Sequence, residues 1–245
     1  MKVEVVSQVD EVKMEEIKHR TVIVIDVLRA SSTVVTALAH GANEVIPVET
    51  VGQARQFHGN QYLLAGERYG KRIAGFPYTN SPTELSSTPL ADSSLVLTTT
   101  NGTRAIQKSL KAEAVLIGSF LNGRACAELA QQFRRDITIL CAGSRQKFAL
   151  EDGLAAGYIL SFLLTKIPDP CINDLGQAMF AAYDFHKDQL PKTLQETATG
   201  KRLMQAGNLA DIEFCAQKDL YPLVPYLKDE SLTIYSPKEK LIGKE

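Results

Sequence analysis

The sequence predicts an α/β fold in which a largely parallel sheet carries helices on both faces. Short apolar runs alternate with segments whose apolar residues recur at helical spacing, and this alternation is typical of repeated strand–helix units. The apolar runs are nearly continuous, as expected for parallel strands that are buried on both faces. From about residue 173 the strand pattern fades, and a helical C-terminal portion is expected to follow.

The expected strands are short and rich in β-branched residues. They cover residues 2–6, 22–26, 44–49, 62–67, 94–100, 114–118 and 137–143, with a short late strand within 232–237. The expected helices cover residues 32–41, 102–110, 122–133, 151–164, 174–187 and 192–207. No linker, internal repeat or low-complexity tract interrupts the pattern. We therefore predict a single domain over residues 1–245.

The composition is that of an ordinary globular protein. Hydrophobic residues make up 44% and charged residues 22% of the 245 residues, and the formal net charge of −1 gives no reason to expect a nucleic-acid partner. The four cysteines are widely spaced with no CxxC pair, which favours reduced thiols in a cytoplasmic protein. The N-terminus lacks the apolar core of a signal peptide. The apolar segment 153–167 is shorter than a membrane span, so we expect a buried helix and no membrane partner.

Polar residues gather where the expected strands end. The segments 26–33, 66–82, 98–105, 118–125 and 141–152 each run from a strand into Gly, Ser, Thr or Asn, often with an Arg or an acid. Ligands of open α/β sheets bind beyond the carboxyl ends of the strands. Helix N-termini attract anions through their unpaired N–H groups. Several such termini at one sheet edge predict a pocket for an anion with more than one charge.

Taken singly, these polar residues have a simpler explanation. Ser, Thr and Asn before a helix are ordinary N-caps, and Arg29 and Arg104 could be solvated. Asp26 is harder to explain in this way, because a carboxylate at the end of a buried strand is costly unless it is paired or bound to a metal. Acids recur in three of these segments: Asp26, Glu67, and Glu151 with Asp152. This recurrence favours a functional site.

In their order and spacing, the segments DVLRASST, GER, NSPTE, TTTNGTRA, GSFLNG and CAGS…EDGLAAG resemble the 2-phosphosulfolactate phosphatase family. The resemblance runs through most of the chain and is densest from about residue 20 to 160. After about Pro168 the match is loose. The resemblance implies a three-layer α/β/α sandwich. It also implies magnesium-dependent hydrolysis of a phosphate ester of sulfolactate, a step toward coenzyme M.

Under this resemblance the cofactor is Mg²⁺, which takes oxygen ligands. Asp26 is the expected ligand or nucleophile, and Glu67, Glu151 and Asp152 are expected to complete the metal site. Arg29 and Arg104 suit a bidentate grip on phosphate or sulfonate, and we assign them catalytic roles with Asp26. Substrate contacts are expected from the polar and glycine residues of the same segments: Ser32, Asn80, Ser81, Asn101, Gly102, Thr103, Ser119, Asn122 and Gly143.

The spacing of other residues argues against three alternative mechanisms. A cysteine phosphatase needs Cys and Arg on either side of a five-residue loop, but Arg145 lies only four positions after Cys141. The chain contains no GxxxxGK[ST] run for a P-loop. Leu28 stands where a haloacid-dehalogenase-type phosphatase would have its second Asp. A histidine phosphatase is not expected either, since no histidine ends a strand: His19, His40, His58 and His186.

Two classes of function can use these residues. The first is a Mg²⁺-dependent phosphatase for a small phosphorylated acid, working through an aspartyl-phosphate on Asp26 or through metal-activated water. The second is a non-catalytic binding protein for a small dianion, and a family member with a drifted substrate is a further alternative. The clustered acids favour the enzyme, because carboxylates beside an anionic ligand are unfavourable unless a cation lies between them. The expected partner is a small anionic substrate, and a homodimer is the assembly we allow for.

Overall fold

The computed structural model describes residues 1–168 and 170–237. Its strands are β1 (Lys2–Val6), β2 (Thr21–Ile25), β3 (Glu44–Pro47), β4 (Tyr62–Arg68), β5 (Lys71–Arg72), β6 (Ser94–Thr98), β7 (Ala114–Gly118), β8 (Ile137–Cys141), β9 (Cys171–Ile172), β10 (Pro225–Lys228) and β11 (Ser231–Ile234). Within the described residues they form one sheet in the order β5-β4-β6-β3-β11-β10-β7-β2-β8-β1-β9. The predicted strands are therefore present, although their order could not be derived from the sequence.

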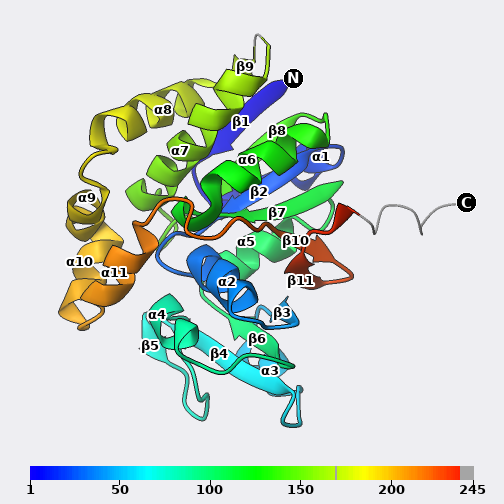
Figure 1. The fold of residues 1–245 in the computed structure, drawn as a ribbon, viewed down its shortest axis with the longest axis vertical. Helices are drawn as coiled ribbons and strands as arrows, with labels where there is room; N and C mark the ends of the chain where they lie inside the picture. The colour runs from blue at the N-terminus through cyan, green and yellow to red at the C-terminus, as the bar shows by residue number, and fades with distance from the viewer. Residues whose placement is uncertain (169, 238–245) are drawn as a thin grey trace, which may run out of the picture.

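Helices cover both faces of this sheet (Figure 1). They are α1 (Met14–Ile17), α2 (Ala30–Ala39), α3 (Val51–Ala54), α4 (Pro82–Ser86), α5 (Gly102–Lys108), α6 (Gly123–Gln132), α7 (Leu150–Lys166), α8 (Asp174–His186), α9 (Leu190–Glu196), α10 (Ala198–Gln205) and α11 (Leu209–Cys215). Two short 3₁₀ turns accompany them, η1 (Val9–Glu11) and η2 (Phe120–Asn122). The predicted α/β class, with a mostly parallel sheet between helical layers, is confirmed.

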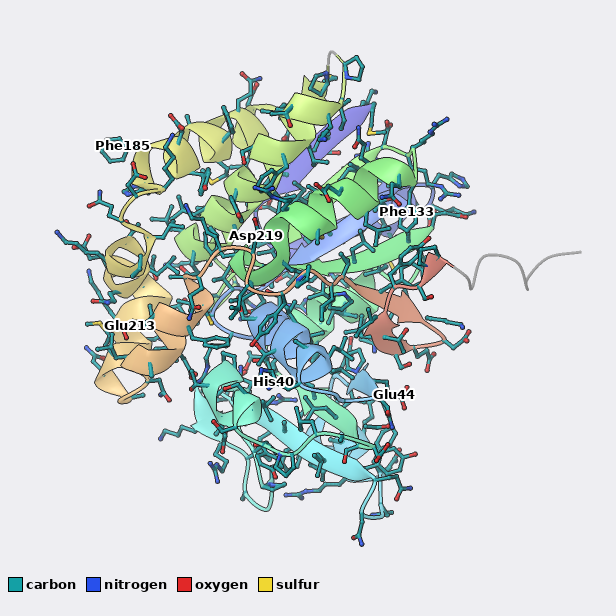
Figure 2. The ribbon with its side chains drawn as sticks, in the orientation of Figure 1. His40, Glu44, Phe133, Phe185, Glu213 and Asp219 are labelled. Carbon is teal, nitrogen blue, oxygen red and sulfur yellow. The ribbon has the colours of Figure 1, made fainter. Side chains whose placement is uncertain are left out.

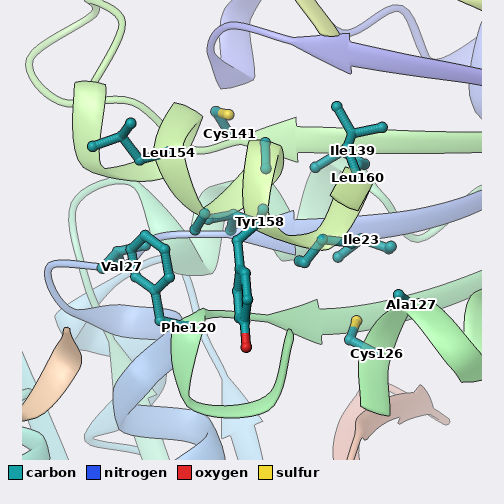
Figure 3. Packing of buried hydrophobic residues seen from close by; sticks show 14 of the residues in the cluster. Ile23, Val27, Phe120, Cys126, Ala127, Ile139, Cys141, Leu154, Tyr158 and Leu160 are labelled. Carbon is teal, nitrogen blue, oxygen red and sulfur yellow. The ribbon is translucent and has the colours of Figure 1, made fainter. Parts of the chain in front are cut away.

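The two faces of β2 explain why its residues are all apolar or β-branched. Ile23 and Ile25 belong to a core shared with α6 and α7, whereas Val22 and Val24 belong to a second core shared with α2 and α5. Figure 3 shows the first core, in which Ile23 lies among side chains from the helices and from β8. Because neighbouring side chains of a strand point to opposite faces, such a strand must be apolar at every position.

The C-terminal hairpin of β10 and β11 joins two blocks of parallel strands. β3, β6 and β4 pair in parallel in one block, and β7, β2, β8, β1 and β9 do so in the other. The hairpin lies between β3 and β7 and is antiparallel to both. Its turn residues Asp229 and Glu230 both have positive φ, of 48° and 71°, as two-residue hairpin turns of type I′ require. The late strand predicted within 232–237 is thus the second arm of a hairpin, which ends at Ile234.

The C-terminal portion is mainly helical, as predicted, and its last helix, α11, ends at Cys215 before the hairpin begins at Pro225. The segment expected to be one helix over 192–207 is divided at Thr197, whose ψ of 162° ends α9 and whose hydroxyl caps α10 by accepting from the N–H of Gly200 at 3.0 Å. In Figure 1 the helices α9, α10 and α11 lie next to one another at one side of the sheet. Segments far from the strands in sequence therefore become available to line a site.

The most apolar helix, α7, is buried, as predicted. It has 17 residues, and side chains along it such as Leu154 and Ile159 are completely inaccessible to solvent. None of the helices in residues 1–168 and 170–237 has the length and apolar character needed to span a lipid bilayer.

Candidate active site

A cavity of about 750 Å³ lies where the loops after β2, β4, β6 and β8 meet the first turns of α5 and α7. Residues of α10 form another part of its wall. The residues predicted for the site that line this cavity are Asp26, Arg29, Glu67, Asn80, Asn101, Arg104, Gly143, Glu151 and Asp152. The fold thus brings all four predicted acids to one place, although they come from distant parts of the chain.

Asp26 directly follows β2, and its carboxylate accepts hydrogen bonds at the N-termini of two helices. The backbone N–H of Ala30 in α2 lies 3.3 Å from Oδ1, and the N–H of Gly102 in α5 also donates. Burial raises the pKa of Asp26 to about 7; the bond from Ala30 opposes this shift, whereas the negative charges of Glu67 and Glu151 add to it. A bare carboxylate is therefore disfavoured at this position, and a proton or a cation would relieve the cost.

Glycine is the only residue type that fits at position 102, beside Asp26. A Cβ at this position would lie 2.6 Å from Asp26 Oδ2 and 2.3 Å from the Cβ of Ala30. The sequence predicts a substrate contact at Gly102, where glycine allows the backbone to approach an anion closely. The structure shows that the approach is to the carboxylate of the protein itself.

Glu67 connects the ends of two neighbouring parallel strands. Its Oε1 accepts hydrogen bonds from the backbone N–H and the hydroxyl of Thr100, at 2.8 and 2.9 Å, and its Oε2 accepts one of 2.6 Å from the N–H of Gly70. Thr100 follows β6, whereas Glu67 belongs to β4. These bonds hold the carboxylate in one orientation at the edge of the cavity.

Asp152, in the first turn of α7, is bound to the ends of two other strands. Oδ1 accepts a hydrogen bond of 2.8 Å from the N–H of Val27, and Oδ2 accepts one of 3.1 Å from the N–H of Gly143. Burial raises the pKa of Asp152 well above its ordinary value, and the charges of Asp26 and Glu151 raise it further. Asp152 therefore positions the loops around the cavity in addition to contributing a carboxyl group.

The carboxylate of Glu151 accepts no hydrogen bond from any described residue, whereas the carboxylates of the other three acids do. Only 3% of the residue is exposed, and it lines the cavity. Carboxylates at such buried positions are normally paired or hydrogen-bonded. In the described residues, no three His, Cys, Asp or Glu side chains are grouped closely enough to hold a metal ion alone. A cation here would need waters or substrate oxygens as further ligands.

Arg29 is the centre of a buried network that reaches the C-terminal helices. Its guanidinium forms an ion pair with Asp211 of α11 and donates to Asn80 Oδ1 at 2.9 Å. The carboxylate of Asp211 also accepts from the hydroxyls of Ser81, at 2.7 Å, and Thr83, at 2.6 Å. Ser81 itself does not line the cavity. Arg29 lines the cavity but is held rigidly, with 4% exposure.

Arg104 lines the cavity from the first turn of α5. Its guanidinium is paired with Asp10 in η1, and about 40% of its side chain is accessible to solvent. Asn101 precedes α5 and also lines the cavity, with no hydrogen bond from its side chain to the backbone of the helix. These two side chains are therefore more accessible to a ligand than Arg29.

Some predicted substrate contacts lie inside the fold: Ser32, Thr103, Ser119 and Asn122. The hydroxyl of Ser32 donates to a backbone carbonyl at 2.9 Å, and that of Thr103 donates to the carbonyl oxygen of Thr99 at 2.9 Å. Ser119 and Asn122 cap each other at η2, where the N–H of Ser119 donates to Asn122 Oδ1 at 3.0 Å. The capping explanation thus holds for Ser119 and Asn122. Ser32 and Thr103 instead bind backbone carbonyl groups of the preceding loops.

Other residues of the cavity were not expected from the sequence. Arg202 and Thr199 come from α10, and Arg145 and Tyr69 come from loops at the cavity mouth. Asp211, the partner of Arg29, lies 182 positions away in the chain. None of the helical residues follows a strand, so the rule that ligands bind at strand ends could not identify them. The polar segment 141–152 contains Arg145, but no feature of the sequence assigns this arginine a role in the site.

Cys141 and the histidines lie away from the cavity wall. Cys141 is completely buried at the end of β8, and burial raises the pKa of its thiol well above the ordinary value, which opposes formation of a thiolate. His40 lies at the C-terminal end of α2 (Figure 2), and its Nε2 is 3.0 Å from the hydroxyl of Tyr221. Within the described residues, the side chains lining the cavity include no cysteine and no histidine. All four cysteines are free thiols, as predicted.

Comparison with known proteins gives a consistent result. A family model described as 2-phosphosulpholactate phosphatase matches residues 6–230. A protein of Clostridium tetani named "Probable 2-phosphosulfolactate phosphatase" is 35% identical over 232 residues, covering 94% of this chain and 98% of the relative. Proteins with the same name from Clostridium acetobutylicum and Caldanaerobacter subterraneus are 36% and 38% identical, covering 92% and 87% of this chain and 97% and 90% of the relatives.

The match includes the loops that form the cavity as well as the helices α8 to α11. The part after Pro168, where the sequence motifs resemble the family only loosely, is thus included in it. With a family match over most of its length, and relatives more than 30% identical along nearly the whole chain, this protein belongs to the 2-phosphosulfolactate phosphatase family of phosphoric monoester hydrolases.

Proposed function

We propose that this protein hydrolyses 2-phosphosulfolactate to sulfolactate and inorganic phosphate, with Mg²⁺ as its cofactor. The observation that carries the proposal is the grouping of Asp26, Glu67, Glu151 and Asp152 with several cationic side chains around one cavity. Phosphate monoesters react slowly without help, and their hydrolysis needs positioned charges around the phosphoryl group. Family membership supports the choice of substrate.

Two of the acids are suited to bind the metal ion. Glu151 has a buried carboxylate with no hydrogen bond to a described residue, and Asp26 carries a carboxylate whose ionisation is opposed by burial and by neighbouring acids. Magnesium commonly takes one or two carboxylates and completes its coordination with waters and phosphate oxygens. A site of this kind does not need three protein carboxylates in contact. When bound, Mg²⁺ would withdraw charge from the phosphoryl oxygens and activate a water molecule.

The remaining residues would position the substrate and the loops. Glu67 and Asp152 accept backbone hydrogen bonds on both carboxylate oxygens, so they hold the strand ends in place. Arg104 and Asn101 lie at the cavity with accessible polar groups that can donate to phosphoryl oxygens. The guanidinium of Arg29 already binds Asp211 and Asn80. Its main role would therefore be to position the loop that carries Asp26.

A binding protein for a dianion is less consistent with this arrangement. Such a protein would gain from cations and N–H donors, but Asp26 and Glu151 would repel the ligand unless a cation lay between them. The carboxylates of Asp26 and Glu151 therefore favour catalysis with a metal over simple anion binding.

Release of phosphate from 2-phosphosulfolactate by the purified protein tests the proposal. We expect turnover with Mg²⁺, no turnover in excess EDTA, and recovery when Mg²⁺ is restored. Glu151→Gln should raise the Mg²⁺ concentration needed for half-maximal activity, whereas Glu128→Gln on the outer surface of α6 serves as the matched control. Full turnover in excess EDTA would refute the role of the metal, and no turnover under any metal condition would refute the phosphatase.

A further inference from the structure

Arg202 in α10 has a cationic side chain that no carboxylate neutralises in the described structure. Arg29 and Arg104, which line the same cavity, are each paired with an aspartate. The guanidinium of Arg202 instead donates to two neutral hydroxyls, Ser144 Oγ at 2.7 Å and Thr199 Oγ1 at 3.0 Å. The side chain is partly buried and lines the cavity. A partly buried guanidinium held by neutral groups can still bind an anion strongly.

Arg145 adds a second positive charge next to Arg202. It lies in the loop after β8, where Arg145 and Gln146 have positive φ values of 54° and 59°. A hydrogen bond of 2.8 Å from the N–H of Ser144 to the carbonyl oxygen of Lys147 closes this loop into a tight turn. Burial lowers the pKa of Arg202, the charge of Arg145 lowers it further, and that of Glu151 opposes this. Two neighbouring guanidinium groups repel each other unless an anion lies between them.

The substrate of the proposed function carries three anionic groups on a three-carbon skeleton. Only the phosphoryl group reacts, so the sulfonate and the carboxylate must be accommodated elsewhere in the cavity. The acids suited to the metal are Asp26 and Glu151, and Arg202 is close enough to Glu151 to respond to its charge. Arg145 is exposed on the loop after β8. The pair thus extends from the acid group toward solvent, a direction that fits the non-reacting end of a small substrate.

We propose that Arg145 and Arg202 form a subsite for the sulfonate or carboxylate group of the substrate, and that this subsite restricts the enzyme to phosphate esters with a second strong anion. This inference rests on the proposed function, because it concerns the non-reacting end of the same substrate. The planar guanidinium groups match the oxygens of a sulfonate or carboxylate in bidentate geometry.

The test compares 2-phosphosulfolactate with ethyl phosphate, which has no second anion, for the wild type, Arg202→Gln and Arg145→Gln. The measured quantity is the ratio of kcat/KM for the two substrates. We expect this ratio to fall about 10- to 100-fold in Arg202→Gln, as for loss of a charge-assisted hydrogen bond, and less in the exposed Arg145→Gln. Arg134→Gln is the matched control, since Arg134 is an exposed arginine that does not line the cavity.

Calorimetric titration with sulfolactate, which has no phosphoryl group, provides a second measurement that does not depend on turnover. In Arg202→Gln, the affinity for sulfolactate should fall by a larger factor than the affinity for inorganic phosphate. If Arg202 binds the phosphoryl group instead, Arg202→Gln should lower kcat/KM equally for both substrates and weaken binding of inorganic phosphate but not of sulfolactate. If Arg202 binds neither group, kcat/KM and both affinities should stay at their wild-type values. Each of these results overturns the subsite. Absence of turnover in the wild type would instead refute the proposed function, and the titration would then decide the subsite alone.

Discussion

The carboxylate of Asp152 accepts a hydrogen bond of 2.8 Å from the backbone N–H of Val27, across 125 positions of the chain. Its other oxygen accepts one of 3.1 Å from Gly143. A single side chain in the first turn of α7 therefore fixes the ends of β2 and β8 relative to each other. Because Asp26 immediately precedes Val27, the position of Asp26 at the cavity depends on this contact.

Replacing Asp26 with Asn should separate a catalytic role from a structural one. Asn keeps an acceptor for the N–H groups of Ala30 and Gly102 but has no charge, so the unfolding free energy in EDTA at pH 8 should hold or rise. Activity with Mg²⁺ should fall by about 10²-fold or more, since a metal ligand or nucleophile is lost. Melting in EDTA and assays in Mg²⁺ measure the two effects. Asp92→Asn, at an exposed position away from the cavity, is the control. A destabilised but active Asp26→Asn protein would mean that Asp26 is structural.

The metal-free protein should lose stability as the pH rises. Asp26 has a pKa of about 7 when folded and an ordinary value of 3.8, so the folded state binds more protons than the unfolded state between these values. The stabilising contribution is complete below about pH 4 and is lost as the pH passes about 7, with a limiting slope of about 1.4 kcal/mol per pH unit for one group. Asp152, whose pKa is also raised, acts in the same direction. Urea unfolding in EDTA from pH 4 to 8 measures the slope. The slope of stability against pH should be shallower in Asp26→Asn than in the wild type. Equal slopes in the two proteins would contradict the raised pKa assigned to Asp26.

Removing the charge of Arg29 should destabilise the fold through Asp211. Both side chains are almost inaccessible, with exposures of 4% and 2%, so Arg29→Met leaves a buried carboxylate without its cation. We expect a loss of about 3–5 kcal/mol in the free energy of unfolding. The double variant Arg29→Met with Asp211→Leu should recover part of this loss, because the unpaired charge is removed as well. Additive losses in the double variant would show that the two side chains are not energetically coupled.

Cys141→Ser should retain substantial activity. The thiol is completely buried, burial raises its pKa well above the ordinary value, and its side chain does not line the cavity. The small loss of packing is expected to affect the melting temperature more than the turnover number. Loss of all activity in a folded Cys141→Ser protein, shown by unchanged circular dichroism, would point to a thiol mechanism.

Local patterns in the sequence were sufficient to predict seven of the parallel strands, one arm of the hairpin, the main helices and the acids near the strand ends, but not β5, β9 or β10. The apolar stretch 22–25 can be stable only as a strand buried on both faces, and Asp26 follows it where a carboxylate is costly. Glu67 is the penultimate residue of β4, and Glu151 lies in the first turn of α7, at the end of the polar segment that follows β8. Residue type and periodicity thus gave the components of the site and the sheet edge at which they should gather.

Other features depend on packing between segments that are far apart in the chain. The hairpin of β10 and β11 lies inside the sheet because open strand edges of β3 and β7 are there to pair with it. Asp211 is buried because Arg29 meets it across the fold. The neighbouring sequence predicts neither the pairing of the hairpin nor the ion pair of Asp211, because four-residue strands and helical aspartates are also common in surface segments. For the same reason the sequence could not separate Asn101, which lines the cavity, from Asn122, which caps η2.

The sequence by itself determined most of the segments that form strands or long helices and which of them carry acids, because these properties follow from side-chain chemistry within a few neighbouring residues. Only the tertiary structure decided which polar groups face the cavity. A hydroxyl or amide at a helix N-terminus can bond to its own backbone or to a ligand, and the two outcomes have the same local sequence. The choice is made by the segment that packs against it, such as α10 bringing Arg202 to the cavity, and that segment is specified by long-range burial rather than by adjacent residues.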